Sequence, residues 1–318
     1  MPKKKVIIIG CGLIGYIYAK VLNKLKCEII AIVDLDQKRL NKVLKICSSK
    51  TLSFKTYKQL LYSVPDINYD IVAIAVPATY HLEIIKKFSK IKKNIICEKP
   101  FTKNYEQAKL AIKYCEKYKV KLVVGFKMRY EKIFIELKKI IDKKIIGDLK
   151  FISISYFQKI PNQSWVIKNG IHREMFVHPL DLVMWLIGNN IKLEYIDKKI
   201  NSKHEQRINA KLKYKKINCF INNGWLSDYA NLNGKSDFVL NAIGSKGQII
   251  LIRPDFLKVF LSKKVINLKF SKFDYDNPFF NEWKKFISYI NTENNDQLVV
   301  NKECLNFHKI IDKVEKYA

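Results

Sequence analysis

The chain has 318 residues, of which 48% are hydrophobic, and it carries a formal net charge of +30. This length favours two domains over one, and the hydrophobic content is too high for an intrinsically disordered protein. The charge would suit an anionic small substrate, but we expect no nucleic-acid partner, because lysines spread along the whole chain supply most of it and only five of the 59 basic residues are arginine (Arg39, Arg129, Arg173, Arg207 and Arg253).

The N-terminal segment is a short basic start followed by the apolar run Val6–Ile9. Glycines at positions 10, 12 and 15 interrupt this run, and lysines follow without a cleavage motif, so we do not expect a signal peptide. A continuous β-branched run of this kind instead predicts a strand buried on both faces of a parallel sheet.

A glycine-rich turn follows this strand directly. The turn Gly10-Cys11-Gly12-Leu13-Ile14-Gly15 opens a helical pattern over residues 16–25, and a second strand, residues 29–33, ends in Asp34. Strand, GxGxxG turn, helix, strand and acid in this order form the dinucleotide-binding fingerprint. The glycines would let the backbone approach a pyrophosphate at the helix N-terminus, and Asp34 could accept hydrogen bonds from the adenosine ribose.

Asp34 also bears on the choice between NAD and NADP, because a carboxylate repels the 2′-phosphate of NADP. Asp36 strengthens this preference, whereas Lys38 and Arg39 weaken it. The sequence therefore favours NAD and leaves NADP open.

Strands and helices continue to alternate as far as residue 125. We predict helices at 37–46, 57–62, 82–90 and 105–118, and strands at 53–54, 71–76, from Asn94 to the Glu98-Lys99-Pro100 turn, and at 122–125. This alternation indicates a doubly wound parallel α/β sheet, a Rossmann domain over residues 1–125.

The strand that begins at Asn94 ends abruptly in Glu98-Lys99-Pro100. Proline lacks an N–H group and disfavours helical geometry at the preceding residue, so the strand stops here. Ligands bind at this carboxyl edge in open α/β sheets, which makes the charged pair a candidate site. An exposed turn with a solvated salt bridge is the alternative.

The pattern changes after residue 125. Strands at 149–156, 208–221, 236–243, 248–252, 256–261 and 265–270 alternate polar and apolar residues, and helices are predicted at 133–141, 179–187, 279–291 and 302–316. Half-exposed strands of this kind predict an α+β domain with a mostly antiparallel open sheet over residues 126–318.

Residues 170–188 carry the second candidate site. Glu174, His178 and Asp181 would share one face of a helix, although Pro179 requires that helix to kink or to begin late. A histidine between two acids suits proton transfer from a substrate hydroxyl; a structural histidine near a helix start is the alternative. We expect no metal site, because no second histidine or cysteine lies at ligand spacing.

The seven cysteines are scattered and none forms a CxxC pair. No apolar stretch is long enough to span a bilayer. These features predict a reduced, cytoplasmic protein with no membrane partner.

The chain resembles the glucose-fructose oxidoreductase / inositol dehydrogenase / MocA family. The matching pieces occur in family order: the glycine turn at 10–15, Asp34, Val76-Pro77 with His81, Glu98-Lys99-Pro100, the segment 125–130, Ile146-Gly147, Trp165, His178-Pro179-Leu180-Asp181, and the segment 185–188. They cover residues 5 to about 190 well and the remainder loosely.

The resemblance implies a Rossmann domain followed by a domain whose open sheet packs against a sister subunit, hence a homodimer or homotetramer. It implies that Lys99 binds the reacting oxygen and the nicotinamide ribose, that His178 is the acid/base, and that Glu174 holds the position of a family aspartate. The expected cofactor contacts are Gly10, Gly12, Leu13, Ile14, Gly15, Asp34, Val76, Pro77, His81, Glu98 and Lys99. The candidate substrate contacts are Arg129, Tyr156, Gln158, Asn162, Trp165, His172, Arg173 and Asp181.

Several positions depart from the family pattern. Glu174 replaces the usual aspartate, Val166 replaces an arginine, Lys127 replaces an asparagine, and Gly170 alone stands for three glycines. These changes surround the expected substrate pocket.

The leading hypothesis is an NAD(P)-dependent oxidoreductase that acts on a secondary alcohol or ketone of a sugar, cyclitol or nucleotide sugar. The alternatives are a non-catalytic NAD-binding sugar sensor and a glycosidase that uses NAD transiently.

Overall fold

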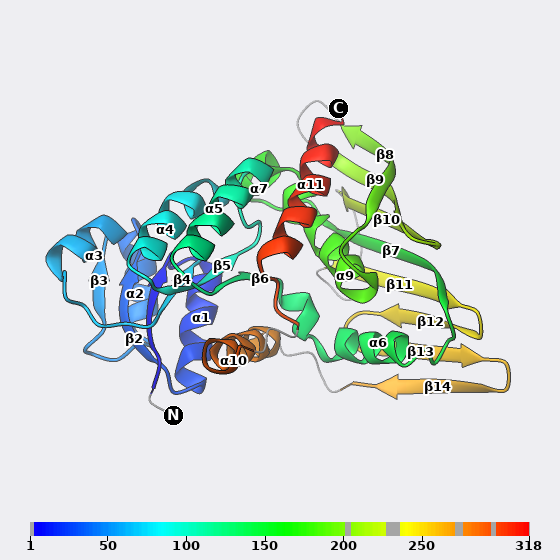
Figure 1. Ribbon diagram of the computed structural model, residues 1–318, viewed down its shortest axis with the longest axis horizontal. Helices are drawn as coiled ribbons and strands as arrows, with labels where there is room; N and C mark the ends of the chain where they lie inside the picture. The colour runs from blue at the N-terminus through cyan, green and yellow to red at the C-terminus, as the bar shows by residue number, and fades with distance from the viewer. Residues whose placement is uncertain (1–2, 201–204, 227–235, 271–275, 294–296, 318) are drawn as a thin grey trace. The chain divides into compact units, whose positions relative to one another are not determined.

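The computed structural model describes residues 3–200, 205–226, 236–270, 276–293 and 297–317. The chain divides into two compact units (Figure 1). The first comprises Met1–Tyr130 and Tyr275–Leu305, and the second comprises Glu131–Asp274 and Asn306–Ala318.

The first unit is built on a six-stranded parallel sheet in the order β3-β2-β1-β4-β5-β6. Its strands are β1 (Lys5–Ile9), β2 (Glu28–Val33), β3 (Leu52–Phe54), β4 (Ile71–Ile74), β5 (Asn94–Glu98) and β6 (Leu122–Gly125). Its helices are α1 (Leu13–Lys24), α2 (Gln37–Leu44), α3 (Tyr57–Ser63), α4 (Ala78–Lys90), α5 (Tyr105–Lys117), the 3-10 helix η1 (Lys127–Tyr130) and α10 (Asp276–Thr292). The predicted doubly wound sheet is confirmed.

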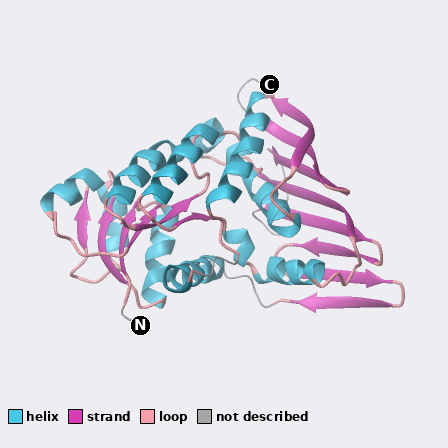
Figure 2. Cartoon of the chain, in the orientation of Figure 1, coloured by secondary structure: helices cyan, strands magenta, loops and turns pink. Residues whose placement is uncertain are grey.

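Helices cover both faces of this sheet, α1 and α2 on one and α4 and α5 on the other (Figure 2). The central strands β1 and β4 are buried on both sides, which explains their continuous β-branched sequences. Polar side chains cap three of the helices at their N-termini, namely Asp36, Thr56 and Asn104.

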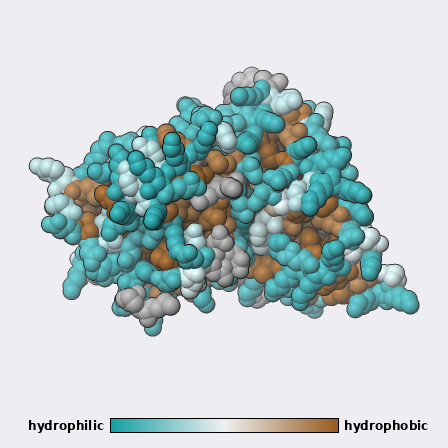
Figure 3. Space-filling model, in the orientation of Figure 1, coloured by the Kyte–Doolittle hydropathy of each residue, from teal (hydrophilic) through white to brown (hydrophobic). Residues whose placement is uncertain are grey.

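Four helices of this glycine-poor chain end on a lysine in the left-handed conformation. In the described part of the chain these are Lys26, Lys92, Lys119 and Lys144, which follow α1, α4, α5 and α6 (Lys132–Asp142) with φ between 50° and 57°. Glycine is the usual residue here, but a lysine places a cation at the negative end of the helix dipole. Part of the large positive charge therefore lies at solvated helix ends, and hydrophilic residues cover most of the face drawn in Figure 3.

Helix α10 returns to the first unit although it follows the whole second sheet in the chain. Its aromatic residues Phe279 and Trp283 pack edge-on against Tyr18 of α1, and Val124 of β6 forms a bridge with Val299. The division at residues 125 and 126 expected from the sequence thus differs from the structure, because an aromatic helix face from far along the chain completes the first core.

The second unit contains an eight-stranded sheet in the order β14-β13-β12-β11-β7-β10-β9-β8. Its strands are β7 (Leu149–Lys159), β8 (Lys192–Ile200), β9 (Glu205–Tyr214), β10 (Ile217–Leu226), β11 (Ser236–Gly244), β12 (Gly247–Ile252), β13 (Phe256–Leu261) and β14 (Lys264–Lys269). Its helices are α6 (Lys132–Asp142), α7 (Ser164–Asn169), α8 (Ile171–Glu174), α9 (Val177–Ile187) and most of α11 (Asn301–Lys316). Among the described strands of this sheet only β7 and β10 pair in parallel, so the predicted mostly antiparallel sheet is confirmed.

Two details of the second sheet differ from the predictions. The single strand expected over 208–221 is a hairpin of β9 and β10, because the chain turns at Lys215, whose φ is 53°. Strand β8 was not predicted, because the sequence around residues 192–200 alternates weakly between lysine and apolar residues.

Candidate active site

The carboxyl ends of β1, β2, β4 and β5 lie at one edge of the first unit's sheet. The order β3-β2-β1-β4-β5-β6 reverses direction at β1 and β4, and such a reversal opens a crevice for a ligand. The glycine turn, Asp34, Val76 and the Glu98-Lys99-Pro100 turn each follow one of these strands. The structure therefore brings the sequence-predicted cofactor residues to a common edge.

The three glycines of the turn have different surroundings. Gly10 adopts a φ of +100°, and a Cβ built on it would lie 2.3 Å from the Ala75 carbonyl oxygen. A Cβ on Gly15 would lie 1.9 Å from the Gly10 carbonyl oxygen, so Gly10 and Gly15 are needed for close packing. Gly12 is different, because its Cβ would meet nothing within 4 Å.

Gly12 is also the N-cap residue of α1 and offers no side-chain cap to the helix N–H groups. Open space beside uncapped N–H groups at a helix N-terminus fits a dinucleotide pyrophosphate. Leu13, the next residue, is 68% exposed at this edge.

Asp34 is held by two backbone N–H groups. Cys11 N–H donates to Oδ2 at 2.7 Å and Asp36 N–H donates to Oδ1 at 2.8 Å. A carboxylate oxygen can accept more than one hydrogen bond, so each oxygen retains capacity for a ribose hydroxyl. Leu35, which sequence reasoning missed, is 75% exposed beside Asp34 and could contact an adenine ring.

His81 lies in the interior rather than at the surface of this edge. Its ring nitrogens are 2.7 Å from the Val76 carbonyl oxygen and 2.9 Å from the Phe101 carbonyl oxygen, and the side chain is fully buried. Burial lowers the pKa of this imidazole. His81 therefore connects the segments after β4 and β5 through its buried ring.

Glu98 ends β5 as a buried carboxylate, so the alternative of a solvated surface pair is wrong for this residue. Its Oε1 accepts a hydrogen bond from the Tyr18 hydroxyl at 2.6 Å, and its Oε2 accepts one from Lys99 N–H at 3.2 Å. Burial raises the pKa of Glu98, and the Tyr18 hydrogen bond and the charges of Lys99 and Lys127 oppose that rise. The following Lys99-Pro100 peptide bond is cis, and Lys99 is half-buried.

In the second unit, His178 lies in the first turn of α9. The helix begins at Val177, as Pro179 requires, and His178 N–H donates to the Met175 carbonyl oxygen at 3.0 Å. Glu174 ends the separate helix α8, so the expected common helix face is wrong for Glu174. Its carboxylate accepts a hydrogen bond from Asn169 Nδ2 at 2.8 Å.

Tyr156 adjoins His178, and Asn223 lies beside Tyr156. The Tyr156 ring meets the His178 imidazole edge-on at 6.4 Å between centroids. Asn223 of β10 lies opposite Tyr156 of β7 and donates from Nδ2 to the Tyr156 carbonyl oxygen at 3.0 Å. Sequence reasoning missed Asn223, although an asparagine at a core-facing position of an otherwise apolar strand was a usable signal.

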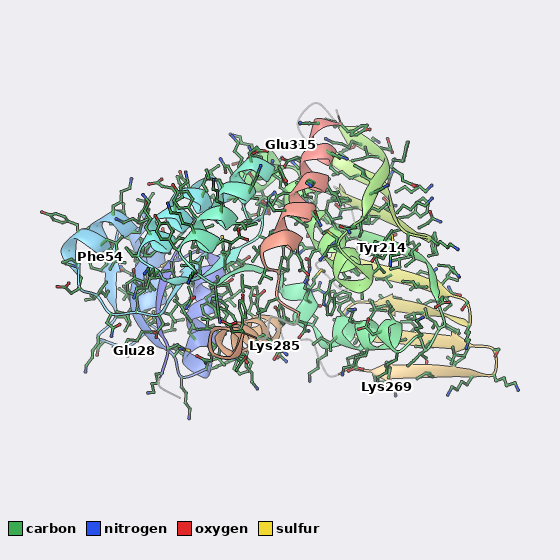
Figure 4. All side chains as sticks on the ribbon, in the orientation of Figure 1. Glu28, Phe54, Tyr214, Lys269, Lys285 and Glu315 are labelled. Atoms are coloured by element: carbon green, nitrogen blue, oxygen red, sulfur yellow. The ribbon has the colours of Figure 1, made fainter. Side chains whose placement is uncertain are left out.

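Four of the predicted substrate contacts are buried side chains. Arg129 pairs with Glu303 at 3.2 Å in the first unit. In the second unit Arg173 pairs with Glu315 of α11, the residue labelled in Figure 4, and His172 lies 3.8 Å from the same carboxylate. Asp181 is 2% exposed inside α9.

The remaining predicted substrate contacts have mixed positions. Gln158 is half-buried near the end of β7 and Asn162 is exposed after it. The side chain of Trp165 lies outside the described residues.

Two features are absent from the described residues. No group of three histidine, cysteine or acidic side chains there could hold a metal ion. Within the same ranges, no helix is both long and apolar enough to cross a membrane.

Comparison with protein families gives two adjacent matches. The model of an oxidoreductase family with an NAD-binding Rossmann fold matches residues 4–126, and the model of the GFO/IDH/MocA C-terminal domain matches residues 134–250. Together they span most of the chain.

Two similar curated proteins are inositol dehydrogenases. Inositol 2-dehydrogenase of Rhizobium meliloti is 27% identical over 186 residues, which cover 57% of this chain and 54% of that protein. Myo-inositol 2-dehydrogenase of Thermotoga maritima is 28% identical over 193 residues, which cover 60% and 57%. The matched region thus spans little more than half the length of either relative.

Solved structures share the fold over the full length. An oxidoreductase from Agrobacterium radiobacter, in complex with NAD+, L-tartaric acid and magnesium, superimposes with a TM-score of 0.87 at 18% identity, covering 99% of this chain and 96% of that one. A 3-ketoreductase from Actinomadura kijaniata in complex with NADP gives a TM-score of 0.80 at 17% identity, covering 99% and 97%.

Proposed function

Because the chain belongs to the GFO/IDH/MocA oxidoreductase family, we propose that it transfers a hydride between nicotinamide and a secondary alcohol or ketone of a sugar, cyclitol or nucleotide sugar. The observation that carries this proposal is the carboxyl edge of the first sheet, where the open Gly12, the preorganised Asp34 and Lys99 follow strands β1, β2 and β5. The relatives named inositol dehydrogenases support a polyol-like substrate.

NAD is the proposed cofactor. Asp34 would repel the 2′-phosphate of NADP, and Arg39, one of the two cations nearby, is partly compensated by Asp36. Arg39 Nε lies 3.7 Å from Asp36 Oδ2, and Asp36 also accepts hydrogen bonds from the N–H groups of Lys38 and Arg39. This exposed ion pair offsets part of the attraction of Arg39 for a 2′-phosphate.

Lys99 is the proposed partner of the reacting oxygen. It follows the last residue of β5, and a protonated lysine can hydrogen-bond both a ribose hydroxyl and an alcohol or carbonyl oxygen. When bound, nicotinamide supplies the hydride acceptor at its C4 carbon. A positive charge at the oxygen stabilises the alkoxide that develops as the hydride leaves an alcohol carbon.

His178 is the proposed acid/base. In alcohol oxidation its imidazole would take the hydroxyl proton, and in ketone reduction it would return that proton. Glu174, one methylene longer than an aspartate, would orient or stabilise the charged imidazole. The hydrogen bond from Asn169 leaves Glu174 with further acceptor capacity for this role.

A substrate panel tests the proposal. The protein is incubated with NAD and with cyclitols, aldoses, sugar acids and nucleotide sugars in turn, and NADH absorbance and sugar release are both recorded. Net reduction of NAD supports the proposal. Sugar release without net reduction would indicate the glycosidase alternative, and tight sugar binding with neither reaction would indicate the sensor.

A further inference from the structure

Tyr18 of α1 is a buried residue that contacts the Glu98-Lys99-Pro100 turn. It is fully buried, and its hydroxyl donates to Glu98 Oε1 at 2.6 Å. The other oxygen of Glu98 accepts the backbone N–H of Lys99 at 3.2 Å. A single carboxylate therefore links the helix after the glycine turn to the residue that would hold the reacting oxygen.

The Tyr18 hydroxyl cannot easily move to another position. The ring packs edge-on against Phe279 at 6.0 Å and against Trp283 at 5.2 Å, both from α10. On the other side, a Cβ on Gly125 would lie 3.2 Å from Glu98 Oε1 and 3.3 Å from the Tyr18 hydroxyl. Packing on both sides therefore fixes the hydrogen bond.

The charged and titratable groups around this pair come from several elements of the first unit. Lys99 and Lys127 bring positive charge to Glu98, whereas Glu282 of α10 and the neighbouring Cys97 lie close enough to Tyr18 to raise the pKa of its hydroxyl. Burial works against ionisation of Glu98, and the Tyr18 hydroxyl is the largest opposing influence on its pKa.

We propose that Tyr18 is a positioning residue: its hydroxyl hydrogen-bonds the carboxylate of Glu98 and holds that group oriented beside Lys99. The importance of this positioning role of Tyr18 for catalysis rests on the function proposed above. The link from Tyr18 through Glu98 to Lys99 is independent of any substrate, so the two can be tested separately.

The first test is Tyr18→Phe in the full-length protein, read out at Lys99. Lys99 is acylated with a trace of acetic anhydride over a range of pH, and the modified fraction is measured by mass spectrometry. Loss of one charge-assisted hydrogen bond should increase the neutral fraction of Glu98, weaken the support that its charge gives to the Lys99 ammonium group and accelerate the acylation of Lys99 at a fixed pH. An unchanged Lys99 titration would overturn the proposal.

The second readout is the free energy of unfolding, measured in urea from about pH 5 to about pH 8. The pKa of Glu98 is raised in the folded state, so the stability linked to it is present at low pH and is lost as pH rises through the folded pKa. Tyr18→Phe raises that pKa further, so its destabilisation should grow with pH. A pH-independent difference would contradict the proposal.

Tyr69→Phe is the matched control. Tyr69 is also buried, at 3% exposed, but its hydroxyl has no hydrogen-bond partner among the described residues. Loss of the Tyr69 hydroxyl should change neither the titration of Lys99 nor the pH dependence of the free energy of unfolding. If the substrate panel fails while Tyr18→Phe behaves as expected, the proposed function is wrong and the Tyr18–Glu98–Lys99 link stands.

Discussion

Lys99 and His178 are the two side chains on which the proposed chemistry depends. Lys99→Ala and His178→Ala should each lower kcat/KM by roughly 10²- to 10⁴-fold, the usual contribution of a positioned acid or base. NAD affinity should remain largely intact in both variants. Steady-state kinetics on the substrate found by the panel and calorimetric titration with NAD measure the two effects.

Lys103→Ala is the control for this pair, because Lys103 is exposed in the same loop as Lys99. It should retain wild-type rates. Near-normal turnover in Lys99→Ala or His178→Ala would refute the assigned roles.

Asp34 is expected to select NAD. Asp34→Ala removes both the ribose acceptor and the charge that repels a 2′-phosphate, so NAD should bind about tenfold more weakly and the preference over NADP should shrink. Dissociation constants for both cofactors provide the measurement. Asp66→Ala, at an exposed position, should leave both constants unchanged.

Arg173 has a structural role that the sequence-based expectation of a substrate contact did not include. Its pairing with Glu315 joins α8 to α11, and burial together with the Arg173 charge lowers the pKa of the nearby His308 to about 3. Because Glu315 is 45% exposed, Arg173→Met should destabilise the protein by only about 1 to 2 kcal/mol. Urea unfolding measures this loss of stability. A raised KM in the folded variant would instead support Arg173 as a substrate contact.

At the scale of elements, two glycines of the same turn are expected to have different roles, one in cofactor binding and the other in folding. Gly12→Ala adds a methyl group in open space beside the N-terminus of α1, so it should weaken NAD binding with little change in Tm. Gly15→Ala places a Cβ 1.9 Å from the Gly10 carbonyl oxygen, so it should lower Tm as well. Thermal unfolding without cofactor, together with NAD titration, distinguishes the effects of the two substitutions. Equal losses of Tm in Gly12→Ala and Gly15→Ala would show that Gly12 is also a packing residue.

Most elements of the first unit were predictable because their signals are local. Buried parallel strands have continuous apolar sequences, and Asp36, Thr56 and Asn104 mark helix starts. Helix ends were harder to predict, because lysines such as Lys26 and Lys92 occupy the left-handed position that glycine usually marks. The start of α9 followed from Pro179, but its separation from α8 depends on packing.

At the scale of the whole molecule, the open face of the second unit's sheet is the expected self-association surface. Phe220 is 41% exposed and packs 5.6 Å from Phe151, whose cross-strand partner Ile243 is 40% exposed. A row of apolar side chains across β10, β7 and β11 suits burial against a second copy of the chain. The family resemblance supports a homodimer or homotetramer.

Phe220→Glu should therefore dissociate the assembly, because it places charge in the centre of this apolar row. Light scattering coupled to size-exclusion chromatography would detect the smaller species. Tyr62→Glu, on an 88% exposed residue of α3, is the control and should not change the mass. A wild-type protein that is monomeric at micromolar concentration would exclude this interface.

The sequence by itself determined the Rossmann unit, the dinucleotide fingerprint and Glu98-Lys99-Pro100, since each depends on residues close together in the chain. Only the tertiary structure decided that α10 belongs to the first unit, that Glu174 and His178 lie on different helices, and that Arg129 and Arg173 pair with acids. Glu303 and Glu315 lie more than 100 residues from those arginines, so local spacing contains no sign of the pairing. An exposed arginine and a buried, paired one have the same local sequence pattern, and folding alone distinguishes them.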